Sequence, residues 1–251
     1  MRAFATCLLL LIAVTASAAG PPKSPLSPEE SLKHFVLADK NLQIELGAAA
    51  LPLVIDVADK AGIHAALAAL PDSWRQIDVL INNAGLALGT APAHEASLDD
   101  WETMIATNCT GLVTMTRALL PAMVARGSGL VINLGSVAGH YPYPGGNVYG
   151  ATKAFVEQFT LNLRADLAGS GVRATNLAPG LCGGTEFSNV RFKGDDAAAA
   201  KVYEGTVPLT AQDIADTAYW IATLPPHINI NSIEMMPTCQ GMGPFTIKRD
   251  L

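Results

Sequence analysis

Tyr149 and Lys153 lie four residues apart in the stretch GGNVYGATKAF (145–155). On a helix, residues i and i+4 share one face, so the two side chains can point into the same volume. A phenol with its usual pKa of about 10 is a poor proton carrier at neutral pH, but a nearby ammonium lowers that pKa. Such a tyrosine can take a proton from an alcohol or give one to a carbonyl oxygen. The spacing alone leaves open the alternative of a surface tyrosine and lysine on one helical turn.

Ser136 and Asn108 are candidates to complete a proton-transfer site with this pair. A serine hydroxyl can hold a substrate oxygen by a hydrogen bond, and an asparagine amide can bind a backbone carbonyl or a water that links to Lys153. These residues are distant in sequence, so the fold has to bring them together.

The apolar pattern predicts the elements that would do so. Short runs rich in β-branched residues predict strands buried on both faces, at 51–57, 78–85, 129–136, 172–180 and 227–236. Helical spacing predicts helices at 61–70, 98–127, 148–171, 195–204 and 210–223, and a short helix at 28–35 capped by Ser27. Ser97 is the expected N-cap of helix 98–127, Gly127 its end, and Pro121 the site of a kink.

Alternating strands and helices predict an α/β fold with a doubly wound parallel sheet. In such sheets ligands bind beyond the carboxyl ends of the strands. Asn83, Ser136 and Pro179 all fall at such ends, and Tyr149 follows Ser136 on the next helix. We therefore expect a site at this edge of the sheet.

Composition excludes several function classes. The 251 residues are 50% hydrophobic and 15% charged with a net charge of −6, and no basic cluster is present, which argues against nucleic-acid binding. The four cysteines are scattered without a C-x-x-C pair, so neither a zinc site nor a disulfide framework is expected. We expect no metal site and buried free thiols.

The N-terminus differs from the rest of the chain. Arg2, a short apolar run and Ala16-Ser17-Ala18 form a signal-peptide-like segment at 1–19, for which a buried N-terminal strand or helix is the alternative. The apolar run is too short to span a bilayer comfortably, so no stable membrane span is expected. A Pro-rich linker and atypical leader follow at 20–46, and the core occupies 47–251.

The motifs NNAG (82–85), Asn108, GS (135–136), YGATK (149–153) and PG (179–180) resemble, in order and spacing, those of the short-chain dehydrogenase/reductase family, from about residue 47 to the end. More narrowly, GGNVYGATKAFVEQF and PGLCGGTEFSNVRFKGDD look like the NADP-dependent 3-hydroxy acid dehydrogenases. The resemblance implies a Rossmann-like sheet and NADP as cofactor, with NAD possible. It also implies a homotetramer with contacts through helices 98–126 and 148–169.

The resemblance also implies residue roles. Tyr149 would be the acid–base, Lys153 would lower its pKa and hold the nicotinamide ribose, Ser136 would polarise the substrate oxygen, and Asn108 would complete the tetrad. The cofactor would further contact Asp56, Val57, Asn83, Ala84, Gly85, Pro179 and Gly180. The substrate would contact Ser136, Gly183 and Gly184, with Arg191 as a candidate for its carboxylate because a planar guanidinium suits one. A surface arginine is the alternative for Arg191.

The implied function is an NADP-dependent oxidoreductase that oxidises a small 3-hydroxy acid such as serine, allo-threonine or 3-hydroxypropionate. Two alternatives stay open: a catalytically silent, truncated or chimeric family member with impaired cofactor binding, and a reductase of 3-oxoacyl-type carbonyls. The resemblance implies a cytoplasmic protein, whereas the signal-like segment argues for export.

The family pattern is missing before residue 47. The family begins with a strand, a glycine-rich turn, a helix and a second strand, and that turn lets the backbone approach the cofactor pyrophosphate. Residues 1–50 hold glycine only at 20 and 47. We therefore expect this unit to be missing or replaced, with HFVLA (34–38) and LQIEL (42–46) as a candidate hairpin that need not restore parallel pairing. Weak or absent NADP binding is the expected consequence.

Overall fold

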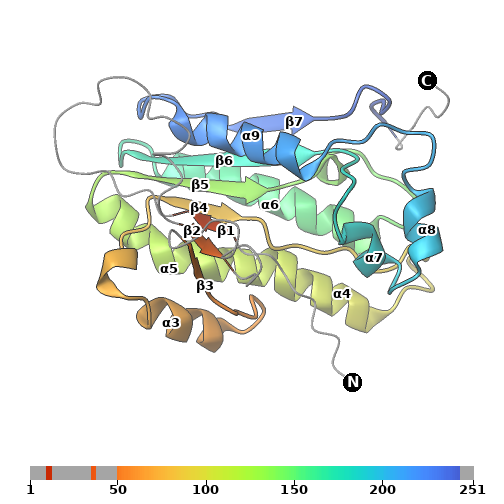
Figure 1. Ribbon diagram of the computed structural model, residues 1–251, viewed down its shortest axis with the longest axis horizontal. Coiled ribbons are helices and arrows are strands. Elements are labelled where there is room, and N and C mark those ends of the chain that lie inside the picture. Colours follow the sequence, from red (N-terminus) through yellow and green to blue (C-terminus); the bar gives the residue numbers. More distant parts are fainter. Residues whose placement is uncertain (1–9, 13–34, 38–49, 244–251) are drawn as a thin grey trace.

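The computed structural model of the chain describes residues 10–12, 35–37 and 50–243. A seven-stranded sheet forms its centre, in the order β3-β2-β1-β4-β5-β6-β7 (Figure 1). The strands are β1 (Leu10–Ile12), β2 (Phe35–Leu37), β3 (Ala50–Pro52), β4 (Val79–Asn82), β5 (Gly129–Leu134), β6 (Val172–Pro179) and β7 (Ser232–Met235). Strands β4 to β7 run parallel, as the sequence predicts.

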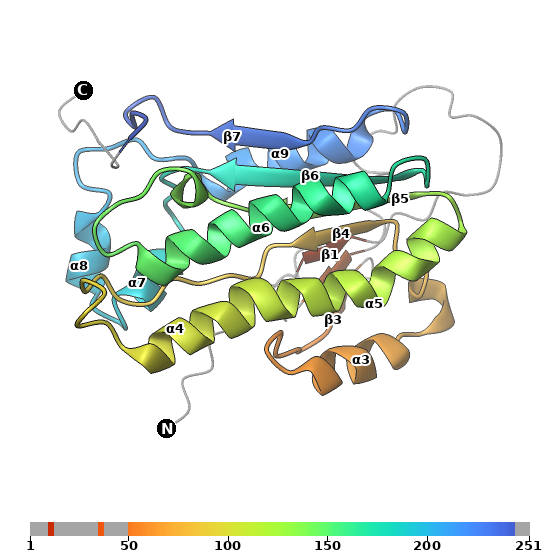
Figure 2. The same cartoon turned by 180° about the vertical axis from the view of Figure 1, so that it is seen from behind.

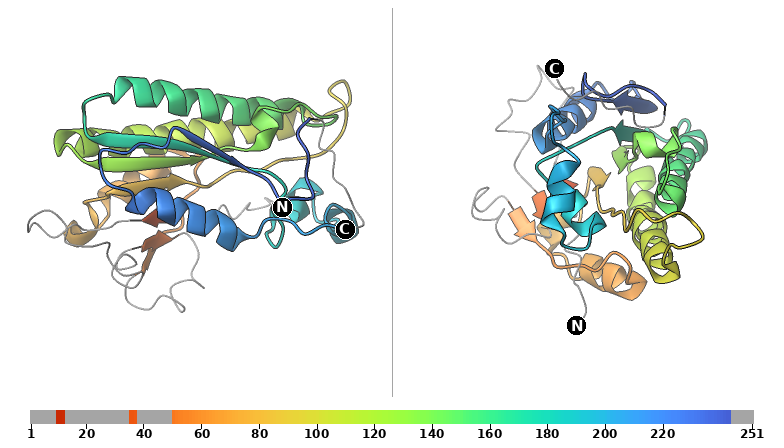
Figure 3. Two further views of the ribbon diagram at one scale, coloured as in Figure 1. Left: turned by 90° about the horizontal axis from the view of Figure 1, so that it is seen from above. Right: turned by 90° about the vertical axis from the view of Figure 1, so that its right-hand side faces the viewer.

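Helices cover the two faces of the sheet. One face carries α4 (Leu98–Ile105), the π-helical segment η3 (Ala106–Gly111), α5 (Leu112–Ala125) and α6 (Asn147–Asp166), and α3 (Lys60–Ala68) lies beside α5 (Figure 2). The opposite face carries α9 (Ala211–Thr223) (Figure 3). The short helices α7 (Phe187–Arg191) and α8 (Asp196–Lys201) lie beyond the carboxyl ends of β5 and β6. The 3-10 turns are η2 (Asp72–Trp74) and η4 (Val137–Gly139).

The central strands are buried on both sides, as expected for a parallel sheet between helical layers. In β4, Leu80 packs into the core beneath α3, α5 and α6, whereas Val79 and Ile81 pack into the core beneath α9. Leu80 is fully buried and its two neighbours are nearly so. Alternate residues of one strand thus serve two cores, which explains its continuous apolar sequence.

The N-terminal strands occupy the gap that the missing family unit would leave. β1 pairs antiparallel with both β4 and β2, and β2 pairs parallel with β3. Two short strands therefore link β3 to β4. Phe35–Leu37 pairs with Leu10–Ile12 on one side and with Ala50–Pro52 on the other. The segment LQIEL (42–46), expected as the other half of a hairpin, lies outside the described residues.

Several predicted bounds need correction. The strand predicted at 51–57 covers only 50–52, since 53–57 leave the sheet. Phe35, predicted to end a helix, lies in β2, and the rest of that helix is outside the described residues. The short helix α7 lies between β6 and α8, where no helix was predicted. Of the signal-like segment, residues 10–12 form β1 and the others lie outside the description.

The predicted helix at 98–127 is continuous but not uniform. The Ser97 hydroxyl caps α4 by accepting a hydrogen bond from the Asp100 amide, as predicted. The chain then widens into the π-helical η3 before resuming as α5, which contains Pro121. The interruption in the α-helical pattern therefore lies at residues 106–111, a feature that the sequence prediction missed.

Candidate active site

The π-helical segment η3 carries Asn108, the most buried polar side chain of the candidate site. Such wide turns often mark functional sites in helices. The Asn108 amide holds the backbone of Leu86: its Oδ1 accepts from the Leu86 N–H at 2.9 Å, and its Nδ2 donates to the Leu86 carbonyl at 2.9 Å. Nδ2 also donates to Thr152 Oγ1 at 2.9 Å. Asn108 thus ties the segment after β4 to helix α6.

Tyr149 and Lys153 lie on the buried face of α6, one turn apart. Lys153 Nζ donates to the Leu134 carbonyl at the end of β5 at 2.7 Å, and lies 5.9 Å from the centre of the Tyr149 ring. A side chain at Gly85 would place its Cβ 3.3 Å from the same Nζ. The alternative of an exposed surface pair is therefore wrong.

Burial raises the pKa of the Tyr149 phenol above its ordinary value. A hydrogen bond with Ser136 lowers that pKa, the charge interaction with Tyr143 raises it, and the positive charge of Arg191 lowers it. Burial dominates, so the sequence prediction of a lowered pKa does not describe Tyr149 in this structure. The Arg191 charge opposes this effect of burial without reversing it.

Ser136 lies at the carboxyl end of β5, where η4 begins. Its hydroxyl donates to the Pro179 carbonyl at 3.4 Å and accepts from the Ala138 amide at 3.1 Å. Ser136 also lies close enough to Tyr149 to lower the pKa of its phenol. The structure thus brings three of the four predicted catalytic side chains, Ser136, Tyr149 and Lys153, close together. Asn108, the fourth, fixes the backbone beside them through its hydrogen bonds to Leu86 and Thr152.

Helix α7 places apolar and cationic side chains against this volume. The Phe187 ring packs against the Tyr149 ring at a centroid distance of 5.6 Å. The Arg191 guanidinium lies 5.4 Å from the centre of the Tyr143 ring, and its Nε donates to the Gly89 carbonyl at 3.3 Å. Arg191 is half-buried, and these two contacts hold its guanidinium against the segment after β4 and the segment before α6.

The predicted cofactor residues follow the ends of β3, β4 and β6. Val57 and Ala84 line one small cavity of about 10 Å³, whereas Asp56 is exposed and accepts a hydrogen bond from the Ala58 amide. Asn83 is also exposed, and its backbone N–H donates to the Ile81 carbonyl at 3.1 Å. Gly85 adjoins Lys153, as described above.

The loop after β6 is held by the C-terminal segment. The Gly180 amide donates to the Met235 carbonyl at 2.7 Å, and the Leu181 amide donates to Gln240 Oε1 at 2.7 Å. A Cβ at Gly180 would lie only 2.2 Å from the same Gln240 oxygen, so a side chain there would displace Gln240.

Two glycines follow in this loop. The Gly183 amide is buried and donates to the Leu209 carbonyl at 2.8 Å, whereas Gly184 is exposed with a φ of +72°. A positive φ of this size favours glycine over residues with a side chain. The two predicted substrate residues therefore differ in accessibility: Gly184 faces solvent and Gly183 does not.

The sequence analysis missed several residues that shape the site. Thr152 lies within YGATK and accepts a hydrogen bond from Asn108. Its position between Tyr149 and Lys153 in the sequence could have indicated that it belongs to the site. Asn82, Asn133 and Thr160 form a buried chain of hydrogen bonds beneath the site, with Asn82 Nδ2 to Asn133 Oδ1 at 2.7 Å and Asn133 Nδ2 to Thr160 Oγ1 at 2.9 Å. No periodicity reveals such pairings.

Within the described part of the chain, no group of three His, Cys, Asp or Glu residues is placed to hold a metal ion. Cys109, Cys182 and Cys239 are free thiols; Cys239 is buried and the other two are half-buried. Among the helices of residues 50–243, none combines the length and hydrophobicity needed to cross a bilayer.

Known proteins share both the sequence and the fold. The family model of short chain dehydrogenases matches residues 30–196. The NADP-dependent 3-hydroxy acid dehydrogenase of Salmonella typhi is 59% identical over 208 residues, covering 83% of this chain and 84% of that protein. The serine 3-dehydrogenase of Agrobacterium fabrum is 54% identical over 209 residues, covering 83% of each chain. A serine dehydrogenase solved in its closed form with NADP+ has a TM-score of 0.81 and 57% identity, covering 84% of this chain and 85% of that one.

Proposed function

Because the chain belongs to the short-chain dehydrogenase family, we propose that it is an NADP-dependent oxidoreductase of small 3-hydroxy acids of the serine, allo-threonine or 3-hydroxypropionate type. The observation that carries the proposal is the convergence of Tyr149, Ser136 and Lys153 on one volume at the carboxyl edge of the sheet. The names of two relatives that are 54% and 59% identical support the substrate class.

The residues present fit the nicotinamide end of the cofactor. The backbone at Gly85 runs beside Lys153 Nζ, and a side chain at residue 85 would crowd that amine. We propose that Lys153, Tyr149 and the backbones of 83–85 and 179–180 hold the nicotinamide ribose and ring, with Asp56 and Val57 at the adenine end. NADP would supply the hydride acceptor there.

The side chains then divide the remaining work. Tyr149, as the phenolate, takes the proton from the substrate hydroxyl while the hydride leaves the carbon for NADP, and Ser136 donates a hydrogen bond to the same oxygen. Arg191 pairs with the substrate carboxylate, which its fork of N–H groups suits. The loop with Gly183 and Gly184 lies against the substrate. Phe187 covers the Tyr149 ring at 5.6 Å, which keeps water from the reacting oxygen.

The pyrophosphate end favours a second candidate, a catalytically silent family member. Where the family has a strand followed by a glycine-rich turn, this chain has β1, which runs antiparallel to β4. Glycine occurs only at positions 20 and 47 of the first 50 residues. Without that turn the diphosphate loses the backbone N–H groups and the helix N-terminus that normally bind it. We also propose that the dehydrogenase core begins at residue 47.

Titration with NADPH, followed by nucleotide fluorescence, separates the two candidates. Micromolar affinity, together with NADP reduction by L-allo-threonine or 3-hydroxypropionate, supports the dehydrogenase. If the fluorescence signal does not saturate even at millimolar NADPH, and no hydroxy acid is turned over, the silent family member is supported and the first proposal is overturned.

We also propose a homotetramer that contacts through α4–α5 and α6. Large apolar side chains are exposed along these helices: Leu98, Ile105, Val124, Phe155 and Leu161. Phe155 and Phe159 stack with their rings 2° from parallel, which presents a flat apolar surface. Light scattering coupled to size-exclusion chromatography tests this, and a mass of one chain, 26.2 kDa, would contradict it.

A further inference from the structure

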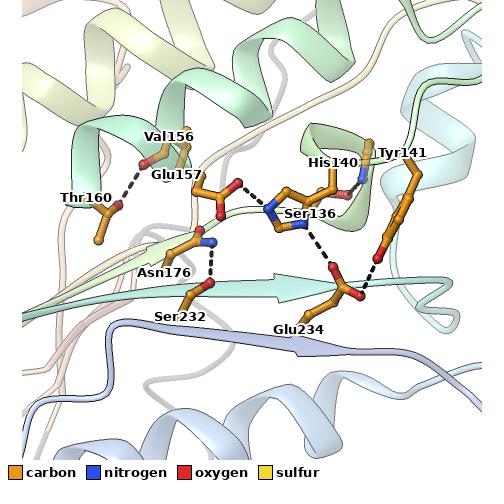
Figure 4. Close-up of polar contacts among 10 residues, drawn as sticks. Ser136, His140, Tyr141, Val156, Glu157, Thr160, Asn176, Ser232 and Glu234 are labelled. Atoms are coloured by element: carbon orange, nitrogen blue, oxygen red, sulfur yellow. Dashed lines mark hydrogen bonds and ion pairs between the residues drawn. The ribbon is translucent and has the colours of Figure 1, made fainter. Parts of the chain in front are cut away.

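His140 lies between two carboxylates, close to the candidate site but outside it. Its Nδ1 lies 2.9 Å from Glu234 Oε2, and its Nε2 contacts Glu157 Oε2. Tyr141 OH donates to the other Glu234 oxygen at 3.1 Å. Figure 4 shows the imidazole between the two acidic side chains, with Glu157 from α6 and Glu234 from β7.

The three residues come from the three elements that position the candidate catalytic groups. His140 ends the turn η4 that starts at Ser136, and its amide donates to the Val137 carbonyl at 3.0 Å. Glu157 lies on α6 one turn beyond Lys153. Glu234 precedes Met235, whose carbonyl accepts from the Gly180 amide. The His140 ring therefore joins the serine turn, the tyrosine–lysine helix and the strand that holds the Pro179–Gly180 loop.

The charges around the ring favour its protonated form. Burial lowers the pKa of His140, but hydrogen bonds with Glu157 and Glu234 and the charges of both carboxylates raise it, and the net direction is upward. Glu157 faces the ring from α6, Glu234 faces it from β7, and Tyr141 lies beside it with a raised pKa caused first by its hydrogen bond to Glu234. The side chains of His140, Glu157 and Glu234 are 32%, 21% and 25% exposed, so solvent screens them only in part.

We propose that His140 is a positioning residue, which holds the Ser136 turn against α6 and β7 by bonding Glu157 and Glu234 at the same time. The role of Ser136 in this inference rests on the proposed function. A protonated imidazole has two N–H donors and can serve both carboxylates, whereas a neutral ring has only one. Deprotonation therefore leaves one carboxylate facing a lone pair, and the link between the elements loosens.

The sign of the pH dependence follows from the raised pKa. The stabilisation is fully present below the unfolded pKa of histidine, about 6.5, and is lost as the pH rises through the higher folded pKa. Removing His140 should therefore matter most at pH 6 and least at high pH. An unlinked histidine would show no such trend.

Thermal unfolding of the full chain between pH 6 and pH 9.5 tests the link without any turnover. We expect the wild type to exceed His140→Gln in Tm by about 2–4 °C at pH 6, with a difference that shrinks as the pH rises. His94→Gln is the matched control, because His94 pairs with Glu95 at 3.2 Å on the surface, with side chains 78% and 65% exposed. Glu157→Gln is the second variant, and it should shift the loss of Tm to lower pH. A His140→Gln difference that is constant with pH, or equal to that of His94→Gln, overturns the proposal.

Kinetics on the same proteins test the connection to Ser136. We expect His140→Gln to lower kcat roughly 10- to 100-fold with KM for the hydroxy acid within about threefold. Ser136→Ala and the double variant with His140→Gln should then have the same kcat within about twofold, because His140 acts through Ser136. If the kcat loss of the double variant equals the product of the two single losses, the positioning role is overturned. If the wild type turns over no hydroxy acid, the proposed function fails separately, and the pH trend of Tm alone decides whether the link exists.

Discussion

Asn108 bonds both polar backbone groups of Leu86, accepting from its N–H and donating to its carbonyl at 2.9 Å each. Leu86 directly follows Gly85, which adjoins Lys153 Nζ. One amide therefore fixes the path of the chain where the nicotinamide is proposed to bind. Asn108 lies in the π-helical turn of the long helix, and its side chain is buried.

Replacement of Asn108 by alanine should destabilise the protein by about 1–3 kcal/mol. The change leaves the buried Leu86 N–H and carbonyl without these partners, and Thr152 loses a donor. Urea unfolding followed by circular dichroism measures the loss. Thr103→Ala is the control, because its hydroxyl bonds the Asp99 carbonyl on an exposed turn of α4, and it should stay within about 0.5 kcal/mol of the wild type. Equal stabilities of the two variants would refute the role of Asn108 as a buried clamp.

Tyr149→Phe should reduce kcat by roughly 10²- to 10⁴-fold, because only the proton-transfer hydroxyl is removed. The ring contact with Phe187 stays, so the fold should change little. Initial rates of NADP reduction by the preferred hydroxy acid give the measurement. Tyr219→Phe on α9, on the other face of the sheet, controls for the loss of a phenol elsewhere. Turnover at the wild-type rate in Tyr149→Phe would show that another group carries the proton.

Arg191→Gln should raise KM for a hydroxy acid at least tenfold and leave KM for an alcohol without a carboxylate unchanged. The pH profile should move as well. Since the Arg191 charge lowers the pKa of Tyr149, its removal raises that pKa further, and oxidation should need a higher pH. Rates between pH 7 and pH 10.5 on both substrates provide the test, with exposed Arg117→Gln on α5 as the control. A KM that rises equally for both substrates would assign Arg191 a structural role.

The sequence predicted the parallel β4–β7 sheet well, because buried strands and amphipathic helices have different periods. It failed where pairing depends on distant segments. Nothing in Leu10–Ile12 or Phe35–Leu37 indicates that these residues pair with each other between β3 and β4. Nor does local pattern reveal a π-helical turn, since it adds one residue to a helix without changing its apolar character.

The sequence predicted that the candidate side chains lie close together, but not the electrostatics around them. Motif spacing placed Ser136, Tyr149 and Lys153 at one edge of the sheet. It did not show that burial raises the pKa of Tyr149 or that Arg191 approaches it, because both depend on how α7 folds back over the site. His140 escaped notice for the same reason: its partners are 17 and 94 residues away along the chain, and only the packed structure joins them.

Gly139 sets how closely the serine turn packs on α6, which makes it a sensitive test of the site geometry. A Cβ there would lie 2.9 Å from the Ala154 nitrogen and from the Lys153 carbonyl carbon, and backbone atoms cannot yield as a flexible side chain can. Gly139→Ala should therefore cost about 1–3 kcal/mol of stability and lower kcat, since η4 and α6 must separate. Gly85→Ala is the matched comparison: its Cβ would meet the end of Lys153 at 3.3 Å, so stability should change little while NADPH affinity falls. Urea unfolding and NADPH titration of both variants distinguish the two effects, and a stable Gly139→Ala protein with full kcat would show that the close contact is not required.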